Sequence, residues 1–207
     1  MTDFRRSRIA YYESRLRDFS SNGILYLFEP EVATSPPLNF QDNQVLRKIR
    51  FAFRSFMGRS DRRPEPTYED NAIAFIDPPY YEIRCFSSGR VEIFRSPIFR
   101  RNVRDPSIRH VDFDGIILDG HRLDNVSKLL RETFNIRSDV FLHIVLFGVQ
   151  EAFPYAKFFT YKMSTTPFKD NVVVLPSLTM PAASTVSLVI LLREHLLGGD
   201  IILPEDL

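Results

Sequence analysis

The chain has 207 residues, of which 44% are hydrophobic and 26% charged, an ordinary balance for a folded domain with a buried core. Its single cysteine, Cys85, excludes an intramolecular disulfide and a cysteine-based zinc site, which favours a reducing, cytoplasmic location. The apolar runs are too short to cross a bilayer, so we expect no membrane partner.

The net charge of +1 hides an uneven distribution of basic side chains. Arginine supplies 22 of the 27 basic residues. Residues 1–110 carry 19 basic and 14 acidic side chains, against 8 and 12 in residues 111–207. Because arginine makes bidentate contacts with phosphate and stacks on flat rings, the first half is a candidate anion-binding surface. The alternative is that codon bias and partly buried guanidinium stems explain the arginines.

In the first half of the chain, the pattern predicts two helices and a short strand. Apolar residues recur at helical spacing over residues 3–20, and residues 24–28 read as a strand. Asn43 is a candidate cap for a second helix that ends at Gly58. One face of this helix is apolar, and the other carries Arg47, Lys48, Arg50 and Arg54.

Residues 59–71 are polar, contain two prolines and lack periodicity, which indicates an exposed loop or linker. We expect residues 1–207 to form one domain. A subdivision near residues 59–71 would separate a basic, helical N-terminal part from a C-terminal part that contains the sheet.

The second half contains most of the predicted strands. We expect strands over residues 72–76, 81–86, 91–95, 140–147, 155–163 and 171–175, and helices over residues 123–136 and from Pro181 to Gly198. Strands outnumber helices and do not alternate strictly with them. The predicted fold class is therefore α+β, with a mixed or mainly antiparallel sheet packed against three to four helices.

Residues 112–119, Asp-Phe-Asp-Gly-Ile-Ile-Leu-Asp, carry the clearest catalytic pattern. They resemble the Mg²⁺-dependent phosphoryl-transfer site of the haloacid-dehalogenase type, which would make Asp112 the nucleophile and Asp114 the acid/base. However, the preceding residues are too polar for a buried strand, and Ile116 stands where that family normally has threonine. The favoured interpretation is that these aspartates are turn and helix-cap residues.

The same region contains the one plausible set of metal ligands. Histidine and carboxylate side chains suit Mn²⁺, Zn²⁺ or Fe²⁺. Their spacing matches no closed-site pattern, so we expect no metal cofactor, except Mg²⁺ or Mn²⁺ under the phosphohydrolase alternative. The candidate ligands are His110, Asp112, Asp114, Asp119 and His121.

Phenylalanine and arginine are adjacent at several positions, a combination that grips single-stranded nucleic acid through phosphate contacts and base stacking. The alternative is that each phenylalanine anchors the core beside an arginine that faces water. The candidate anion-binding or nucleic-acid-binding residues are Arg47, Arg50, Arg54, Arg95, Arg100 and Arg101. By contrast, His143 alternates within an apolar strand, which predicts a core histidine with its own partners.

The second half also resembles a known bacterial region. The segment Arg90-Val-Glu-Ile-Phe follows Gly89, a helix then leads into residues 140–147 and Gly148-Val149-Gln150, and an apolar helix follows residues 172–176. Residues 72–199 thus resemble the region that follows the Schlafen-like, AlbA-type ATP-binding module. The resemblance implies a non-catalytic accessory or assembly domain, and it transfers no functional residue.

The leading hypothesis is a non-enzymatic interaction or assembly domain that binds a protein partner or itself and contacts an anionic ligand through arginines. A metal-dependent phosphohydrolase using Asp112 and Asp114 is one alternative. A nucleic-acid-binding module is the other.

Overall fold

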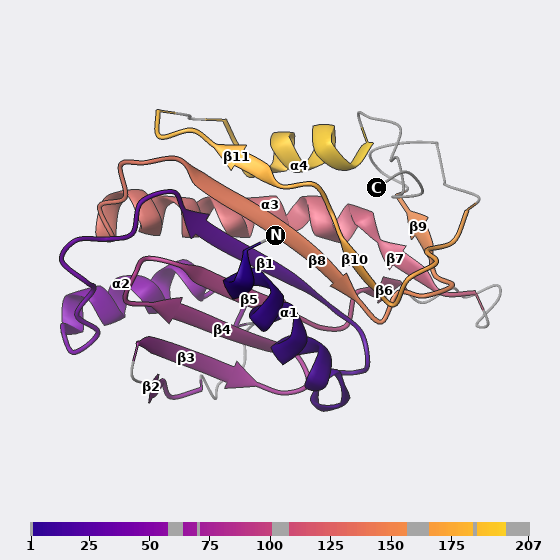
Figure 1. The fold of residues 1–207 in the computed structure, drawn as a ribbon, viewed down its shortest axis with the longest axis horizontal. Helices are drawn as coiled ribbons and strands as arrows, with labels where there is room; N and C mark the ends of the chain where they lie inside the picture. The colour runs from indigo at the N-terminus through magenta and orange to yellow at the C-terminus, as the bar shows by residue number, and fades with distance from the viewer. Residues whose placement is uncertain are drawn as a thin grey trace.

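The computed structural model describes residues 2–57, 64–69, 71–100, 108–156, 166–183 and 186–197. This part of the protein contains four α-helices and two β-sheets (Figure 1). In chain order the elements are α1 (Asp3–Ser14), β1 (Gly23–Pro30), α2 (Asn43–Phe53), β2 (Thr67–Glu69), β3 (Ala72–Asp77), β4 (Tyr81–Phe86), β5 (Val91–Arg95), β6 (Phe99–Arg100), β7 (His110–Asp112), α3 (Phe113–Lys128), β8 (Val140–Phe147), β9 (Phe153–Tyr155), β10 (Val172–Val174), β11 (Leu178–Met180) and α4 (Leu188–Leu197).

The larger sheet has eight strands, and all its pairings are antiparallel. The strand order is β10-β8-β1-β5-β4-β3-β2, and β11 also pairs with β8. A smaller sheet has the order β6-β7-β9, with β7 and β9 parallel. The predicted α+β class with a mainly antiparallel sheet is therefore confirmed.

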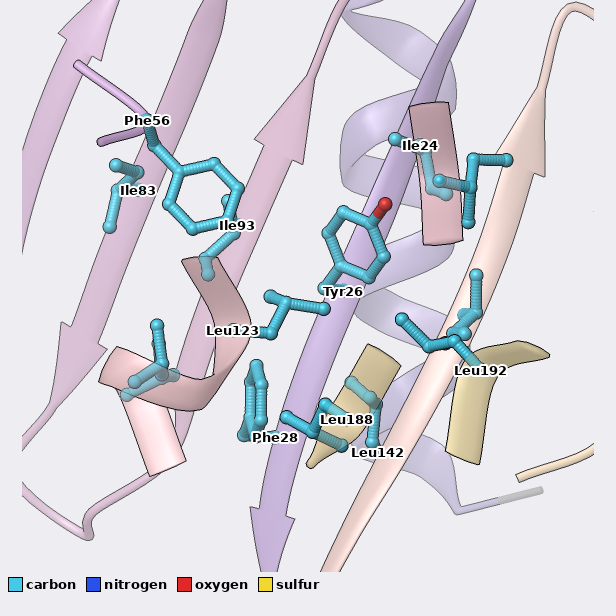
Figure 2. Close-up of a cluster of buried hydrophobic side chains, with 14 of the residues drawn as sticks. Ile24, Tyr26, Phe28, Phe56, Ile83, Ile93, Leu123, Leu142, Leu188 and Leu192 are labelled. Carbon is cyan, nitrogen blue, oxygen red and sulfur yellow. The ribbon is translucent and has the colours of Figure 1, made fainter. Parts of the chain in front are cut away.

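The two faces of the larger sheet have different covers. Helices α2, α3 and α4 pack on one face, and α1 crosses the other (Figure 1). Each face of the sheet carries its own cluster of buried apolar side chains. Because successive side chains of a strand point to opposite faces, β1 contributes to both clusters. Tyr26 and Phe28 face Leu123 of α3 and Leu188 of α4 (Figure 2), whereas Leu27 packs on the α1 side.

A single sheet joins the segments on either side of residues 59–71. Strand β1 lies between β8 and β5, so the N-terminal part of the chain supplies an inner strand. Side chains of α2, β3 and α3 belong to one apolar cluster.

Several predicted elements are confirmed in position. The hairpin of β4 and β5 and the long strand β8 have the predicted bounds, and β8 lies inside the sheet between β1 and β10. The first helix is shorter than predicted, since α1 ends at Ser14 and a 3-10 turn follows over Leu16–Asp18. The cap of α2 is Asp42 rather than Asn43, because Asp42 accepts a hydrogen bond from the backbone N–H of Gln44 at 2.7 Å.

Two other helices begin at residues different from those predicted. Helix α3 begins at Phe113, ten residues before the predicted start, and ends in a π-helical turn over Leu129–Thr133. Helix α4 begins at Leu188 instead of Pro181. The carboxylate of Asp124 accepts hydrogen bonds from the Ser187 hydroxyl at 2.7 Å and the Leu188 N–H at 2.8 Å, which ties the start of α4 to α3.

The short strands β2, β6, β7 and β11 were not predicted, because two or three residues cannot display an alternating pattern. The strand predicted over residues 155–163 is described only to residue 156, where β9 covers Phe153–Tyr155. The predicted end of α2 at Gly58 and the end of the last helix at Gly198 lie outside the described residues. None of the described helices is both long and apolar enough to span a bilayer.

Candidate functional site

The aspartate pair that resembles a catalytic motif begins helix α3. Asp112 ends β7 and is the N-cap of α3, where its Oδ1 accepts a hydrogen bond from the backbone N–H of Gly115 at 3.1 Å. Asp114 is buried in the first helical turn. Asp112 therefore has the helix-cap role that was favoured over a nucleophile.

The candidate metal ligands are spread along β7 and α3. His110 lies in β7 beside the rings of Phe153 and Tyr155, and His121 is exposed two turns along α3 from Asp114. In the described part of the chain, no group of three or more His, Cys, Asp or Glu side chains could hold a metal ion.

Asp119 is buried on α3 and binds three side chains. Its Oδ2 accepts hydrogen bonds from Tyr26 Oη at 2.8 Å and Arg95 Nε at 2.9 Å, and its Oδ1 accepts one from Arg122 at 2.8 Å. Burial and the charge of Asp119 raise the pKa of Tyr26 well above its usual range, so the hydroxyl stays protonated and donates. Arg95 is thus used to tie α3 to the sheet.

The arginines on the α1 side of the sheet are paired in a similar way. The buried carboxylate of Glu92 accepts two hydrogen bonds from Arg8, both at 2.7 Å, and one from Tyr12 at 3.0 Å. Glu82 is equally buried, and its partners are Tyr11, Arg15 and Arg84. Since these guanidinium groups have carboxylate partners within the chain, we assign them a structural role and not ligand binding.

A groove of about 830 Å³ lies between α2 and the C-terminal part of α3 with its π-helical turn. This volume falls within the range of roughly 300–1,000 Å³ that is common for ligand sites. Helix α2 lines one wall because its apolar stripe, with Ile49 and Phe53, is buried against the core and its basic stripe faces outward. The charged residues of the lining are Arg47, Lys48, Arg50, Arg54, Lys128 and Glu132.

The groove gathers several exposed cations on neighbouring turns of two helices. Arg50 makes an exposed ion pair with Glu65 at 3.0 Å. Arg47, Lys48, Arg54 and Lys128 are exposed, and none of these four forms an ion pair with another described residue. Five basic side chains and one acidic side chain therefore give the groove a net positive charge.

Phe51 lies in the middle of this basic surface. Its side chain is 72% exposed, although phenylalanine is normally buried. Arg47, Phe51 and Arg54 follow one another at spacings of four and three residues, which places them on one stripe of α2. An exposed ring between guanidinium groups can stack on a flat ligand while the cations bind its anionic groups.

The structure brings together half of the predicted anion-binding residues. Arg47, Arg50 and Arg54 line the groove, whereas Arg95 binds Asp119 elsewhere. The side chain of Arg100 and the whole of Arg101 lie outside the described residues. The predicted anion-binding residues did not include Phe51 or Lys128. The helical spacing of Phe51 between Arg47 and Arg54 was the signal that could have identified it. Nothing in the sequence indicates that Lys128 faces α2.

Cys85 and His143 are buried side chains with little free surface. Burial raises the pKa of the Cys85 thiol, which keeps it protonated and unreactive. His143 contacts Ser177 and Glu29, as expected for a core histidine with its own partners.

No protein-family model matches this chain, and the comparisons with curated proteins and with solved structures found no match either. The resemblance of residues 72–199 to the region after the Schlafen-like module therefore stays a prediction. The charges and contacts of the described residues are the basis for a functional proposal.

Proposed function

We propose that this chain is an interaction domain that binds single-stranded nucleic acid in the groove between α2 and α3. The observation that supports this proposal most directly is the exposed ring of Phe51 among four cations that have no ion pair with another described residue. Other arginines, such as Arg8 and Arg95, have carboxylate partners inside the fold.

The cations supply affinity for a phosphate backbone. A basic side chain that binds phosphate releases condensed counterions, and this release drives binding without regard to sequence. Arg47 and Lys48 lie on α2, Arg54 is the C-cap of this helix, and Lys128 lies across the groove on α3. A strand that follows the groove would therefore meet a row of cations on the α2 side and Lys128, one turn before Glu132, on the other side.

Phe51 supplies the contact that distinguishes a nucleic acid from other polyanions. Base–aromatic stacking contributes about 1–3 kcal/mol per base and tolerates every base, because each has a flat face. An acidic protein or a polyphosphate would use the cations but gain little from an exposed ring. A role as an accessory domain, which the Schlafen-like resemblance implies, is compatible with such binding.

Fluorescence anisotropy with labelled oligothymidylate and oligouridylate tests the proposal. Removing both Arg47 and Arg54 by substitution with alanine should weaken binding at least tenfold, since two phosphate contacts are lost. Phe51→Ala should weaken it by roughly five- to 150-fold, the equivalent of the stacking energy. Phe51→Tyr keeps a flat ring and should retain most of the affinity.

The matched control removes two exposed arginines outside the groove, Arg6 and Arg17. This control has the same net charge as the groove variant, so it should bind the oligonucleotide nearly as well as the wild type. Equal weakening in both double variants would contradict a defined groove. Binding of polyphosphate or an acidic peptide as tightly as the oligonucleotide, with no effect of Phe51→Ala, would contradict a nucleic-acid ligand.

A further inference from the structure

The sheet face that α1 covers, opposite to the groove, holds a serine, a histidine and a glutamate in a row. The Oγ atom of Ser177 lies 2.5 Å from Nδ1 of His143, and Nε2 of His143 lies 3.3 Å from Oε2 of Glu29. The three side chains come from the β10–β11 connection, β8 and β1. In acyl-transfer sites, serine is activated by a base within hydrogen-bond reach. A third group next to the base orients it.

The backbone presents Ser177 to solvent at a break in the strand pairing. Val174 of β10 pairs with Val145, and Leu178 of β11 pairs with Leu142. Three residues therefore separate the paired positions on the β10–β11 side, against two on β8. Such an extra residue forms a bulge, a device that redirects side chains and is over-represented next to active sites. Ser177 is exposed as a result, whereas His143 is buried.

The charges around His143 suit a general base. Burial and the positive charge of Arg5 lower the pKa of His143 below its usual 6.5, although Glu29 acts in the opposite direction. The imidazole is therefore neutral at pH 7 and able to accept a proton through Nδ1. Glu29 is also bound by Arg90 at 2.9 Å and lies 3.3 Å from Arg5, so its carboxylate is held in place.

The contact between His143 and Glu29 is looser than a hydrogen bond. Nε2 of His143 is buried, and its alignment with Glu29 at 3.3 Å falls short of hydrogen-bond geometry. Catalytic hydrogen bonds are often long in the absence of substrate and tighten when charge develops. A protonated His143 would attract the carboxylate of Glu29 across this short distance.

We propose that Ser177 is a nucleophile activated by His143, and that this site transfers the acyl group of small esters to water. Oγ of Ser177 attacks the ester carbonyl carbon while its proton passes to Nδ1 of His143. The bond from that carbon to the alcohol oxygen then breaks, and His143 returns the proton to the leaving alcohol. Water, deprotonated by His143, next attacks the acyl carbon. The bond from that carbon to Oγ of Ser177 then breaks, His143 returns the proton to Oγ, and the carboxylic acid leaves.

The full chain can be tested with a fluorophosphonate probe and with p-nitrophenyl acetate. Peptide mass mapping should place the phosphonyl group on Ser177, and more than one equivalent of p-nitrophenol should be released per chain. Ser177→Ala should abolish both signals. His143→Gln should slow labelling by about 100-fold or more, the usual contribution of a general base. Ser7→Ala, at an exposed serine on α1, should change neither.

The pH profile of wild-type labelling keeps the proposal testable even if a variant fails to fold. Labelling should rise with pH as His143 loses its proton and then level off. Glu29→Gln should move this rise to lower pH, because Glu29 raises the pKa of His143. Labelling scattered over several serines, a rate unaffected by His143→Gln, or release of no more than one equivalent would overturn the proposal.

Discussion

Asp112 shows how one backbone contact bears on the choice between two chemistries. In the sequence it is the first carboxylate of a pattern typical of phosphoryl transfer. In the structure its side chain accepts a hydrogen bond from the backbone N–H of Gly115, one of the N–H groups at the start of α3 that have no partner within the helix. The sequence already favoured this role, because the residues before Asp112 are too polar for a buried strand.

Asp112→Ala should lower the free energy of unfolding by about 1 kcal/mol, since the helix loses its N-cap. Asp112→Asn should stay within about 0.5 kcal/mol of the wild type, because asparagine caps as well as aspartate. Urea unfolding measures these free energies, and thermal unfolding with and without Mg²⁺ measures Tm. A Mg²⁺-dependent rise in Tm that Asp112→Asn abolishes would contradict a role limited to capping.

The lowered pKa of His143 should make stability depend on pH. Because the pKa of His143 is lower in the folded state than the unfolded value of 6.5, the folded chain binds fewer protons at this group. The contribution of His143 to stability is therefore fully present above pH 6.5 and is lost as pH drops through the folded pKa. Burial also lowers the pKa of His195, which acts in the same direction. His143→Gln should therefore reduce the acid-side loss in thermal melts. The control His121→Gln, at an exposed position, should leave it unchanged.

At the scale of elements, α1 is held on the sheet by ion pairs as well as by apolar contacts. Its Arg8 forms a two-pronged pair with Glu92, while Tyr12 stacks on Phe94 with ring centroids 4.9 Å apart. Burial raises the pKa of Glu92 although Arg8 opposes the shift. Removing a carboxylate from water is costly unless a partner compensates for the lost hydration. A buried charge of this kind needs its partner.

Arg8→Ala should cost about 3 kcal/mol of stability, because it leaves the buried Glu92 without its main cation. Arg6→Ala removes the same charge from an exposed position of the same helix and should change stability by no more than about 0.5 kcal/mol. Urea unfolding of the two variants makes the comparison. Equal costs would show that the pair with Glu92 does not hold α1.

The bounds of the longer strands were easier to predict from the sequence than the start of the last helix. The β4–β5 hairpin and β8 were predicted well, because their apolar residues are continuous or alternate clearly and glycine marks the turn. The start of α4 depends on Asp124, which comes from another helix and is 64 residues away from Leu188. Local patterns carry no information about such a contact, and the prediction for α4 was wrong for that reason.

At the scale of the whole molecule, the large sheet separates two chemically different surfaces. Helix α1 lies on one side of the sheet, and α2 and α3 lie on the other (Figure 1). The side with α1 contains the buried carboxylates Glu82 and Glu92 paired with arginines, while the side with α2 and α3 carries the cationic groove. The basic stripe of α2 was visible in the sequence, but arginine content could not show which guanidinium groups already have partners. Arg47 and Arg95 looked equivalent there, and only the fold places Asp119 beside Arg95.

The salt dependence of oligonucleotide binding tests the central claim most directly. Each phosphate contact contributes about −0.7 to the slope of log K against log salt concentration for a single strand. Four engaged cations therefore predict a slope of about −3 for the wild type, and Arg47→Ala should make it shallower by about 0.7. A slope near zero, or one that Arg47→Ala leaves unchanged, would contradict the binding of nucleic acid in the α2–α3 groove.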